Sequence, residues 1–520
     1  MSKESISNNK RIAKNTMLLY FRMLIMMGVG LYTSRIVLSA LGISDYGINN
    51  VVGGVVTMAS FLNAGLTAAT QRFISYELGR GDSDKLADVF SNSLIVHGAI
   101  ALIVFILSET AGLWFVNNCL NIDANRMIAA NWVFQFSVFS FMIGIMSVPY
   151  NSTIIAHEHM NAFAYISIFE VLFKLFVAFC LVYFDVDKLI LYSFLIFIIS
   201  LIVRICYGIY CKRHFPECKA RLTINKTILR EMGSFSGWSM FGNLGFIGRD
   251  QGANVILNIF MGTSLNAARG IALHVTSLVN QFSVNFTMAM NPQITKQFAA
   301  GELQKCSMLV YEGAKFSFFL LTAISIPVII NCDYLLKLWL GIVPPYTSQF
   351  IILSLAVCLL YCLTQTVTVA LQATKRIKTF QIGICILLIS ELPFVWLILL
   401  YNLPPYYIMY PQIITSVIAI IFRFYLLKRY VPSFEWTRYI FGVLIRSILV
   451  SSCCLFLSYI VKQQLTDNLI NLFLSSIVSL IITLLLCYLL GLNKSEKSVI
   501  NNYINKIVKR SKTDNKGICK

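Results

Sequence analysis

Charged side chains lie inside long apolar runs of this sequence, where they are costly and are therefore candidates for binding or transport chemistry. A charge within a membrane usually faces a protein interior or a water-filled cavity, so each one marks a candidate functional site. Basic residues predominate among them. The basic residues within apolar runs are Arg22, Arg35, Lys174, Arg204, Arg249, Arg269, Lys315, Arg423 and Arg446.

Position along the runs divides these basic residues into two groups. A long basic side chain near the end of a membrane span can extend its charge to the surface, so a residue there needs no partner. The residues in such positions are Arg204, Arg269, Arg423 and Arg446. The residues too deep for this are Arg35, Lys174, Arg249 and Lys315, and Arg22 fits either group.

Two of the deep lysines have an acidic neighbour on their own helix face. Glu170 precedes Lys174 by four residues and Glu312 precedes Lys315 by three. Side chains at these spacings meet on a helix surface. An ion pair that only holds helices together is therefore as good an interpretation of each lysine as a binding site.

The deep arginines lack such a neighbour. Arg249 is adjacent to Asp250, but successive side chains on a helix point about 100° apart, so we expect these two not to pair. Arg35 has no acidic residue within a helical turn. Deep cations therefore outnumber unpaired deep acids, of which Asp250 and Glu391 are the main examples.

An excess of buried cations predicts an anionic substrate. A cationic cavity attracts anions, and arginine in particular binds phosphate or carboxylate through two parallel hydrogen bonds. Asp250 and Glu391 are candidate ion-coupling residues. The predicted substrate-binding residues are Arg35, Arg249, Lys315 and Arg22.

Membrane-spanning helices must position these residues. Of the 520 residues, 57% are hydrophobic and 12% are charged, whereas a soluble protein carries about 25% charged residues. Apolar runs long enough to cross roughly 30 Å of hydrocarbon recur along the chain, and backbone groups in lipid must be hydrogen-bonded within a helix. The sequence therefore predicts an all-α integral membrane protein with about fourteen transmembrane helices.

The loops between the predicted spans alternate in charge. The loops on one side, together with both terminal segments, hold 29 of the 42 Lys and Arg residues, and the loops on the other side hold four. Basic loops stay in the cytoplasm. Both termini of this multi-pass membrane protein are therefore expected to be cytoplasmic.

A weak internal repeat divides the chain. Sliding the sequence by 220 residues aligns Gly42 with Gly262 and Gly81 with Gly301, and it maps the first two spans onto the seventh and eighth. Such a repeat predicts two six-helix bundles related by a pseudo-two-fold axis along the membrane normal. The expected segments are the N-terminus (1–16), the N-terminal bundle (17–210), a cytoplasmic loop (211–232), the C-terminal bundle (233–426), two extra helices (440–490) and a basic tail (491–520).

Other chemistry has little support in the sequence. The nucleotide-binding pattern GxxxxGK[ST] is absent, so ATP-driven pumping by this chain alone is not expected. The His-Glu-His stretch at 157–159 does not place both rings on one helix face, and no CxxC pair occurs. We expect no cofactor, no metal and no nucleic-acid partner. A glycan polymerase or transferase, the alternative from a different class, would need a large polar loop, and the longest candidate, 109–127, is small.

Three stretches resemble the bacterial Wzx-type polysaccharide flippases of the multidrug/oligosaccharidyl-lipid/polysaccharide (MOP) exporter superfamily. In that family an arginine in the first span precedes a Leu-Gly turn and a Tyr-Gly pair, as Arg35 precedes Leu41-Gly42 and Tyr46-Gly47 here. The stretches are YTSRIVLSALGISDYGINNVVGGVV (32–56), LTAATQRFISYELGRGD (66–82) and GRDQGANVILNIFMG (248–262).

The resemblance implies a MATE-like pair of bundles around a cationic lumen that works by alternating access. The implied substrate is an undecaprenyl-diphosphate-linked oligosaccharide, moved from the cytoplasmic to the periplasmic leaflet for O-antigen, capsule or other surface polysaccharide. A polysaccharide polymerase and a chain-length regulator are the implied protein partners. A cation-coupled multidrug exporter and a lipid II flippase of the same superfamily remain alternatives.

Overall fold

Helices make up the fold. The computed structural model describes residues 3–498 except 58–59, 119, 121, 185, 220–222, 262, 341–342, 432–433 and 495. Within these residues no β-strand is present. The predicted all-α class is confirmed.

Within the described residues, ten helical segments are long and apolar enough to cross a membrane. Side chains on their outward faces are exposed and apolar, as lipid contact requires. The ten segments are Ser83–Asn118, Ala124–Ala156, Met160–Leu181, Lys188–His214, Leu303–Ile330, Thr347–Ala373, Ile377–Leu400, Pro405–Tyr430, Trp436–Gln463 and Leu469–Gly491.

Four further helical segments have the length of a span but are more polar than these ten. Gly42, with φ 77°, interrupts α1 (Lys3–Thr57), and the second part of α1 leads into α2 (Ser60–Arg80). The other two are α8 (Lys226–Met261) and α9 (Thr263–Ala299). These segments correspond to the spans that the sequence predicts at 17–41, 48–70, 233–257 and 268–291, and they complete the predicted set of about fourteen.

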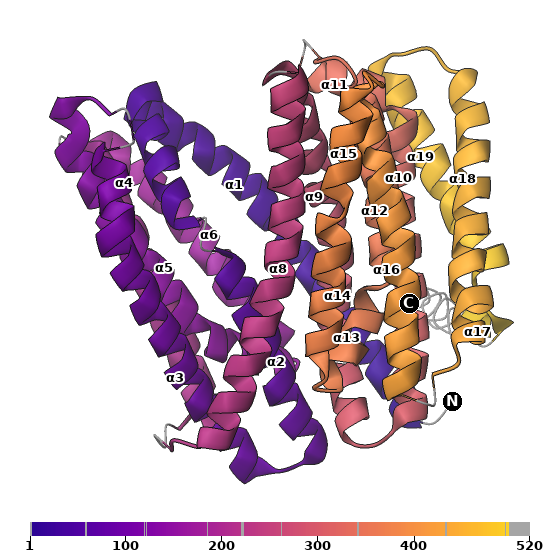
Figure 1. The fold of residues 1–520 in the computed structure, drawn as a ribbon, viewed down its shortest axis with the longest axis horizontal. Coiled ribbons are helices and arrows are strands. Elements are labelled where there is room, and N and C mark those ends of the chain that lie inside the picture. The colour runs from indigo at the N-terminus through magenta and orange to yellow at the C-terminus, as the bar shows by residue number, and fades with distance from the viewer. Residues whose placement is uncertain are drawn as a thin grey trace, which may run out of the picture.

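The helices form two bundles and an appended pair (Figure 1). In the N-terminal bundle α1 and α2 pack with α3 (Ser83–Leu107), α4 (Leu113–Asn118), α5 (Met127–Ala156), α6 (Met160–Tyr183) and α7 (Lys188–His214). In the C-terminal bundle α8 and α9 pack with α10 (Leu303–Ile330), α11 (Cys332–Leu340), α12 (Thr347–Cys362), α13 (Gln365–Ala373), α14 (Ile377–Ile389), α15 (Glu391–Leu400) and α16 (Met409–Tyr430). After α17 (Trp436–Tyr439), helices α18 (Arg446–Gln463) and α19 (Leu469–Leu486) pack against α10. The predicted bounds of the bundles and of the flanking segments stay a prediction.

Two turns that the internal repeat aligns have the same conformation in the structure. Gly81 and Gly301 both have positive φ, 72° and 78°, a conformation that glycine adopts without strain. In each turn the following acid pairs with a lysine three residues on. The pairs are Asp82 with Lys85 at 2.9 Å and Glu302 with Lys305 at 2.7 Å. Gly262, the predicted counterpart of Gly42, lies outside the described residues.

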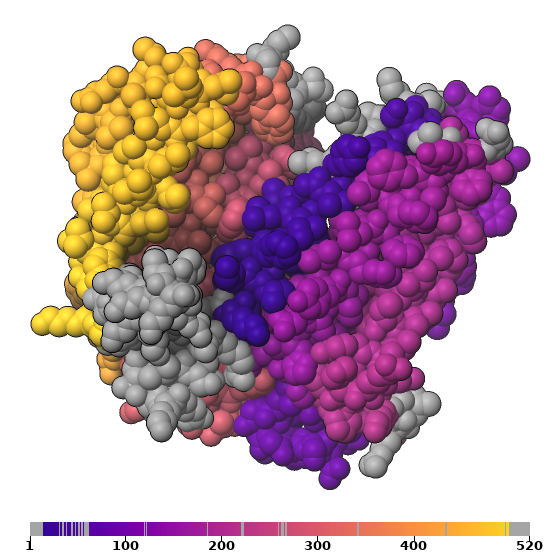
Figure 2. Space-filling view, turned by 180° about the vertical axis from the view of Figure 1, so that it is seen from behind, coloured from indigo at the N-terminus to yellow at the C-terminus, as the bar shows by residue number. Residues whose placement is uncertain are grey.

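The bundles meet at one end and diverge toward the other. We call the closed end, which carries the loops at 81–82, 157–159, 300–302 and 374–376, the basic end. Figure 1 shows the two bundles converging there, and Figure 2, seen from behind, shows the molecule hollowed between its two halves at the opposite end. Helix α2 packs against both α8 and α9 across the bundle boundary.

Candidate functional site

A cavity of about 680 Å³, lined by both apolar and polar side chains, lies within the C-terminal bundle. Its walls come mainly from α8, α9, α12, α14 and α16, and Ala64 of α2 contributes from the other bundle. The polar residues along it include Asn243, Arg249, Asp250, Asn280, Tyr361, Thr364, Gln412, Thr415, Ser416 and Arg423.

An ionic cluster occupies one part of this cavity. The Arg249 guanidinium donates from Nε to Asp250 Oδ1 at 3.0 Å, and its Nη2 lies 2.9 Å from the same oxygen. Arg249 Nε also lies 3.9 Å from Glu391 Oε2. The expectation that Arg249 and Asp250 do not pair is therefore wrong, because the arginine side chain is long enough to fold back beside its neighbour.

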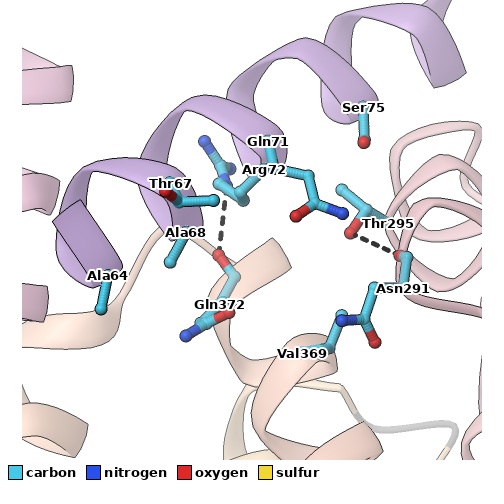
Figure 3. A pocket seen from close by; sticks show the side chains of 10 residues that line it. All are labelled: Ala64, Thr67, Ala68, Gln71, Arg72, Ser75, Asn291, Thr295, Val369 and Gln372. Atoms are coloured by element: carbon cyan, nitrogen blue, oxygen red, sulfur yellow. Dashed lines mark hydrogen bonds between the residues drawn. The ribbon is translucent and has the colours of Figure 1, made fainter. Parts of the chain in front are cut away.

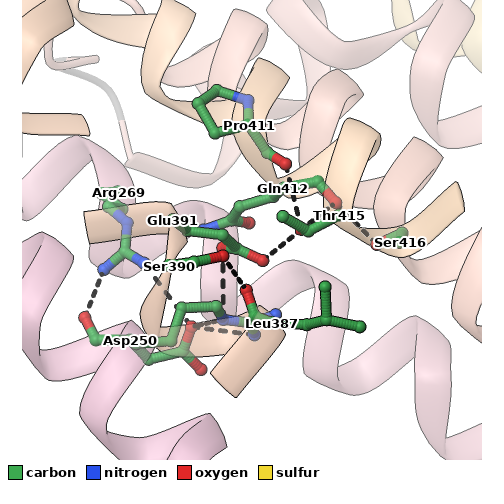
Figure 4. Close-up of polar contacts among 10 residues, drawn as sticks. Asp250, Arg269, Leu387, Ser390, Glu391, Pro411, Gln412, Thr415 and Ser416 are labelled. Carbon is green, nitrogen blue, oxygen red and sulfur yellow. Dashed lines mark hydrogen bonds and ion pairs between the residues drawn. The ribbon is translucent and has the colours of Figure 1, made fainter. Parts of the chain in front are cut away.

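Arg269 completes the cluster from the start of α9. Its Nη1 donates to the Asp250 backbone carbonyl at 3.1 Å and to the Asn254 side chain, and its Nη2 lies 3.7 Å from Asp250 Oδ1 (Figure 4). Arg269 is only 1% exposed. Its charge does not reach the membrane surface, so the prediction that Arg269 extends to the surface is wrong.

Glu391 is the most deeply buried acid of the cluster. Its side chain is 1% exposed, and Thr415 of α16 donates a hydrogen bond to its Oε1 (Figure 4). Glu391 and Asp250 thus share Arg249 as a partner. The structure brings together three of the sequence-predicted residues, Arg249, Asp250 and Glu391, although their roles in binding or coupling stay predictions.

Arg423 is a cavity residue that the sequence analysis assigned to the membrane surface. It lies in α16 and is 4% exposed, so its charge does not reach the surface. Its neighbours along the same helix face also line the cavity. The signal in the sequence is a stripe of polar and small residues at helical spacing, Gln412, Thr415, Ser416, Ala419 and Arg423.

Lys315 lies apart from the cavity. It is 3% exposed on α10 and its Nζ lies 2.5 Å from Glu496 Oε1, beyond the end of α19. The pair expected with Glu312 is replaced by this longer-range pair. Lys174 does pair with Glu170, at 2.6 Å, as its spacing indicates.

Arg22 lies where the two bundles meet. It is 8% exposed and stacks on Phe163 at 4.6 Å. Its guanidinium donates weakly to Ser167 at 3.5 Å and, across the boundary, to Asn285 at 3.4 Å. No acidic side chain pairs with it among the described residues. The side chain of Arg35 lies outside the described part of the structure, so the prediction for Arg35 stays as it was.

A second, smaller pocket of about 320 Å³ lies between the bundles, bounded by α2, α9 and α13 (Figure 3). Arg72 of α2 reaches across to the C-terminal bundle there. Its Nε donates to the Gln372 carbonyl and its Nη2 to the Ala373 carbonyl, both at 3.1 Å. These carbonyls end α13, where the helix dipole favours a cation.

The loop at 157–159 contacts the opposite bundle at the basic end. Glu158, with φ 62°, accepts a hydrogen bond from Gln293 at 2.6 Å and pairs with Lys296 at 2.9 Å. Burial, reinforced by His157, His214 and Lys296, lowers the pKa of the His159 imidazole below its usual value, which keeps the ring neutral at neutral pH. No group of three metal-ligating side chains forms among the described residues.

Comparison with known proteins establishes the fold. No family model matches the sequence, and no curated protein matches it. Solved MATE structures do match in three dimensions, at identities that show the fold alone. The chain has the fold of the solved MATE structures.

Three of these structures give the extent of the likeness. A MATE transporter in the bent conformation has a TM-score of 0.71 at 13% identity, over 82% of this chain and 98% of that chain. A Vibrio cholerae MATE transporter has a TM-score of 0.68 at 17% identity, over 84% of this chain and 100% of that chain. A MOP superfamily transporter from Pyrococcus furiosus has a TM-score of 0.67 at 13% identity, over 82% of this chain and 97% of that chain.

Proposed function

We propose that this chain is a transporter that moves an anionic, lipid-linked oligosaccharide across the bacterial inner membrane by alternating access. The cargo would be an undecaprenyl-diphosphate-linked repeat unit, moved outward for surface polysaccharide synthesis. Both termini would be cytoplasmic. The membrane-spanning MATE-type fold supports transport, and the charge of the buried sites supports an anionic cargo.

The observation that carries this proposal is the surplus of buried cations in the C-terminal bundle. Arg249, Arg269 and Arg423 lie in or beside the cavity, against the two acids Asp250 and Glu391. Arg22 adds another cation at the bundle boundary without an acidic partner among the described residues. A site with this balance attracts anions and repels simple cations.

The shape of the molecule supports alternating access. The bundles contact each other at the basic end and diverge at the other end (Figure 1). If basic loops face the cytoplasm, this conformation is open toward the periplasm. The diphosphate is the part of the cargo that is most costly to move through hydrocarbon, and the arginines would replace its hydration.

A cation-coupled multidrug exporter is the second candidate, and buried acids favour it. Asp250 and Glu391 lie within the cavity cluster. One similar structure is an outward-facing multidrug resistance MATE family transporter. The Pyrococcus furiosus MOP transporter, in contrast, is described as having a binding pocket of reverse polarity that suggests a different function. The cationic surplus here favours the flippase, and a lipid II flippase shares the same physics.

Deletion of the gene separates these candidates. A flippase predicts that lipid-linked repeat units accumulate on the cytoplasmic face while surface polysaccharide disappears. A lipid II flippase predicts loss of peptidoglycan synthesis instead. Intact surface polysaccharide together with increased drug sensitivity would contradict the flippase and favour the exporter.

Substitution of Arg249 tests the site. We expect Arg249→Ala to lower polysaccharide export at least tenfold at unchanged protein level, because the diphosphate loses a charged partner worth about 1.5–3 kcal/mol. Arg249→Lys should retain part of the activity. Arg204→Ala is the matched control, since Arg204 stacks on Tyr150 at 3.8 Å in the N-terminal bundle, away from the cavity. Normal export by Arg249→Ala would remove this residue from the site.

A further inference from the structure

Arg423 is a buried cation without a counter-charge. It is 4% exposed, and neither a hydrogen bond nor an ion pair to it is found among the described residues. Two rings lie near it, with the guanidinium carbon 5.9 Å from the centre of Tyr361 and 5.7 Å from that of Phe380. Its Nε is fully enclosed and unbonded. Arg423 is also a lining residue of the cavity.

Arg269, another deeply buried arginine of this bundle, has polar and acidic partners, although its Nε and Nη2 carry no hydrogen bond to any described residue. Arg269 bonds the Asp250 carbonyl and the Asn254 side chain, and it lies near the Asp250 carboxylate. A buried charge is stable only when it is paired, hydrogen-bonded or hydrated. Cation-π contacts with two rings offset only part of the cost. Arg423 is therefore poised for an anionic partner that comes from outside the protein.

The cavity wall around Arg423 supplies neutral hydrogen-bonding groups. Thr364, Gln412 and Ser416 line the same cavity, and Tyr361 stacks beside the guanidinium. The cavity, at about 680 Å³, is within the roughly 300–1,000 Å³ of ordinary small-ligand sites. A guanidinium with free donors and nearby hydroxyls and amides suits an oxyanion with several acceptor oxygens.

The acids of the cavity do not oppose such a ligand strongly. Thr415, which bonds Glu391, lies eight residues before Arg423 on α16. That separation is about 12 Å along a helix. Both acids are also held by Arg249, and Asp250 by Arg269 as well. The acids and Arg423 thus occupy different parts of one cavity.

We propose that the Arg423 end of the C-terminal cavity is a binding site for a phosphate-class oxyanion, and for a diphosphate in particular. The preference for a diphosphate rests on the proposed function, whereas binding of an oxyanion rests on Arg423 and its surroundings. The site adds a contact for the cargo inside the C-terminal bundle. It is separate from Arg22 at the bundle boundary.

Inorganic pyrophosphate is the probe for this site. The full chain is placed in nanodiscs of phosphatidylcholine, and its thermal unfolding is followed against pyrophosphate at constant ionic strength kept with sodium chloride. We expect pyrophosphate to raise the unfolding temperature of the wild type in a saturable way. Arg423→Gln should weaken the apparent affinity at least tenfold, and Arg423→Lys should weaken it less.

Two further variants guard against misfolding. Arg204→Gln removes a ring-stacked arginine outside the cavity and should leave pyrophosphate affinity unchanged. Ser416→Leu fills the cavity without removing Arg423 and should weaken pyrophosphate binding. It tests the site if Arg423→Gln fails to fold. Absence of saturable pyrophosphate binding in the wild type would overturn the proposed site. An Arg423→Gln variant that binds pyrophosphate as tightly as the wild type would also overturn it. Where Arg423→Gln does not fold, wild-type affinity in Ser416→Leu would do the same.

Lipid composition separates two sources of the ligand. If a lipid phosphate can occupy the same site, pyrophosphate binding will be weaker in phosphatidylglycerol nanodiscs, and that competition must be absent from Arg423→Gln. Equal binding in both lipids would show that membrane phospholipids do not compete for the site and that it selects the diphosphate group. Failure of the proposed function is seen elsewhere, in unchanged surface polysaccharide after gene deletion, so pyrophosphate binding and export can fail independently.

Discussion

Two equivalent loops close the basic end, and they do so with different chemistry. Glu158 in the loop between α5 and α6 and Lys375 in the loop between α13 and α14 both have positive φ, 62° and 65°. Glu158 pairs with Lys296 of α9 at 2.9 Å. Lys375 lies 5.2 Å from the ring centre of Tyr76 of α2. Tyr76 and Lys296 are 220 residues apart, which is the offset of the internal repeat.

The two contacts differ in burial as well as in charge. The Glu158 side chain is 1% exposed, whereas that of Lys375 is 42% exposed and also pairs with Glu231 at 3.0 Å. Buried ion pairs are costly to break, and exposed ones contribute little. The two halves of the internal repeat therefore share the position of this contact but not its strength. We infer that the Glu158 side holds the closed end.

Charge reversal at Glu158 should have the largest effect. Glu158→Lys places two ammonium groups together, and disruption of a buried pair costs on the order of 3 kcal/mol, or roughly 100-fold in the closed-to-open equilibrium. Hydrogen exchange of peptides spanning 150–160 and 290–300 should increase in nanodiscs. The double variant Glu158→Lys with Lys296→Glu should restore protection. Unchanged exchange in the single variant would contradict the inference.

A methyl group at Gly79 should have the next largest effect. A Cβ at this position of α2 would lie 2.5 Å from the Lys296 carbonyl oxygen and 2.9 Å from the Ala299 Cβ. Gly79→Ala should therefore push α2 from α9 at a cost of about 1–3 kcal/mol, with increased exchange at the basic end.

Gly233→Ala is the matched control for that substitution. A Cβ at Gly233 in α8 meets no atom within 4 Å. This variant should raise the unfolding temperature slightly, since alanine in a helix is favoured over glycine by about 0.5–1 kcal/mol. The same response from both variants would mean that close packing of α2 on α9 does not hold the end closed.

Loss of the Lys375 charge should have the smallest effect. Lys375→Met removes an exposed ion pair and a cation-π contact, together worth about 1 kcal/mol or less. Exchange of peptides spanning 370–380 should change less than threefold. An effect equal to that of Glu158→Lys would show that the two loops contribute equally, and the comparison would fail.

The sequence predicts the fold better than it predicts the site. Span number follows from the length of apolar runs, which is a local property, and the division into two bundles follows from the internal repeat. Arg249, Asp250 and Glu391 were found because a deep charge is visible in a single helix. Arg423 and Arg269 were misassigned because distance from a helix end does not tell which way a side chain faces. That direction depends on how the helices rotate against one another in the bundle.

Long-range pairing was the other limit of the sequence. Lys315 has an acid three residues before it, yet its partner is Glu496, which is 181 residues away. The sequence also does not predict the pair between Glu158 and Lys296 of the opposite bundle, because the position of a loop in the sequence does not indicate which helix it contacts.

The ion pair between Lys315 and Glu496 limits where the C-terminal segment of this protein can be truncated or fused to a tag. It anchors the stretch after α19 to α10, with the lysine side chain 3% exposed. A cut after residue 492 would leave that ammonium buried without its carboxylate, at a cost of about 3–5 kcal/mol. A fusion partner or cleavage site should therefore follow Glu496.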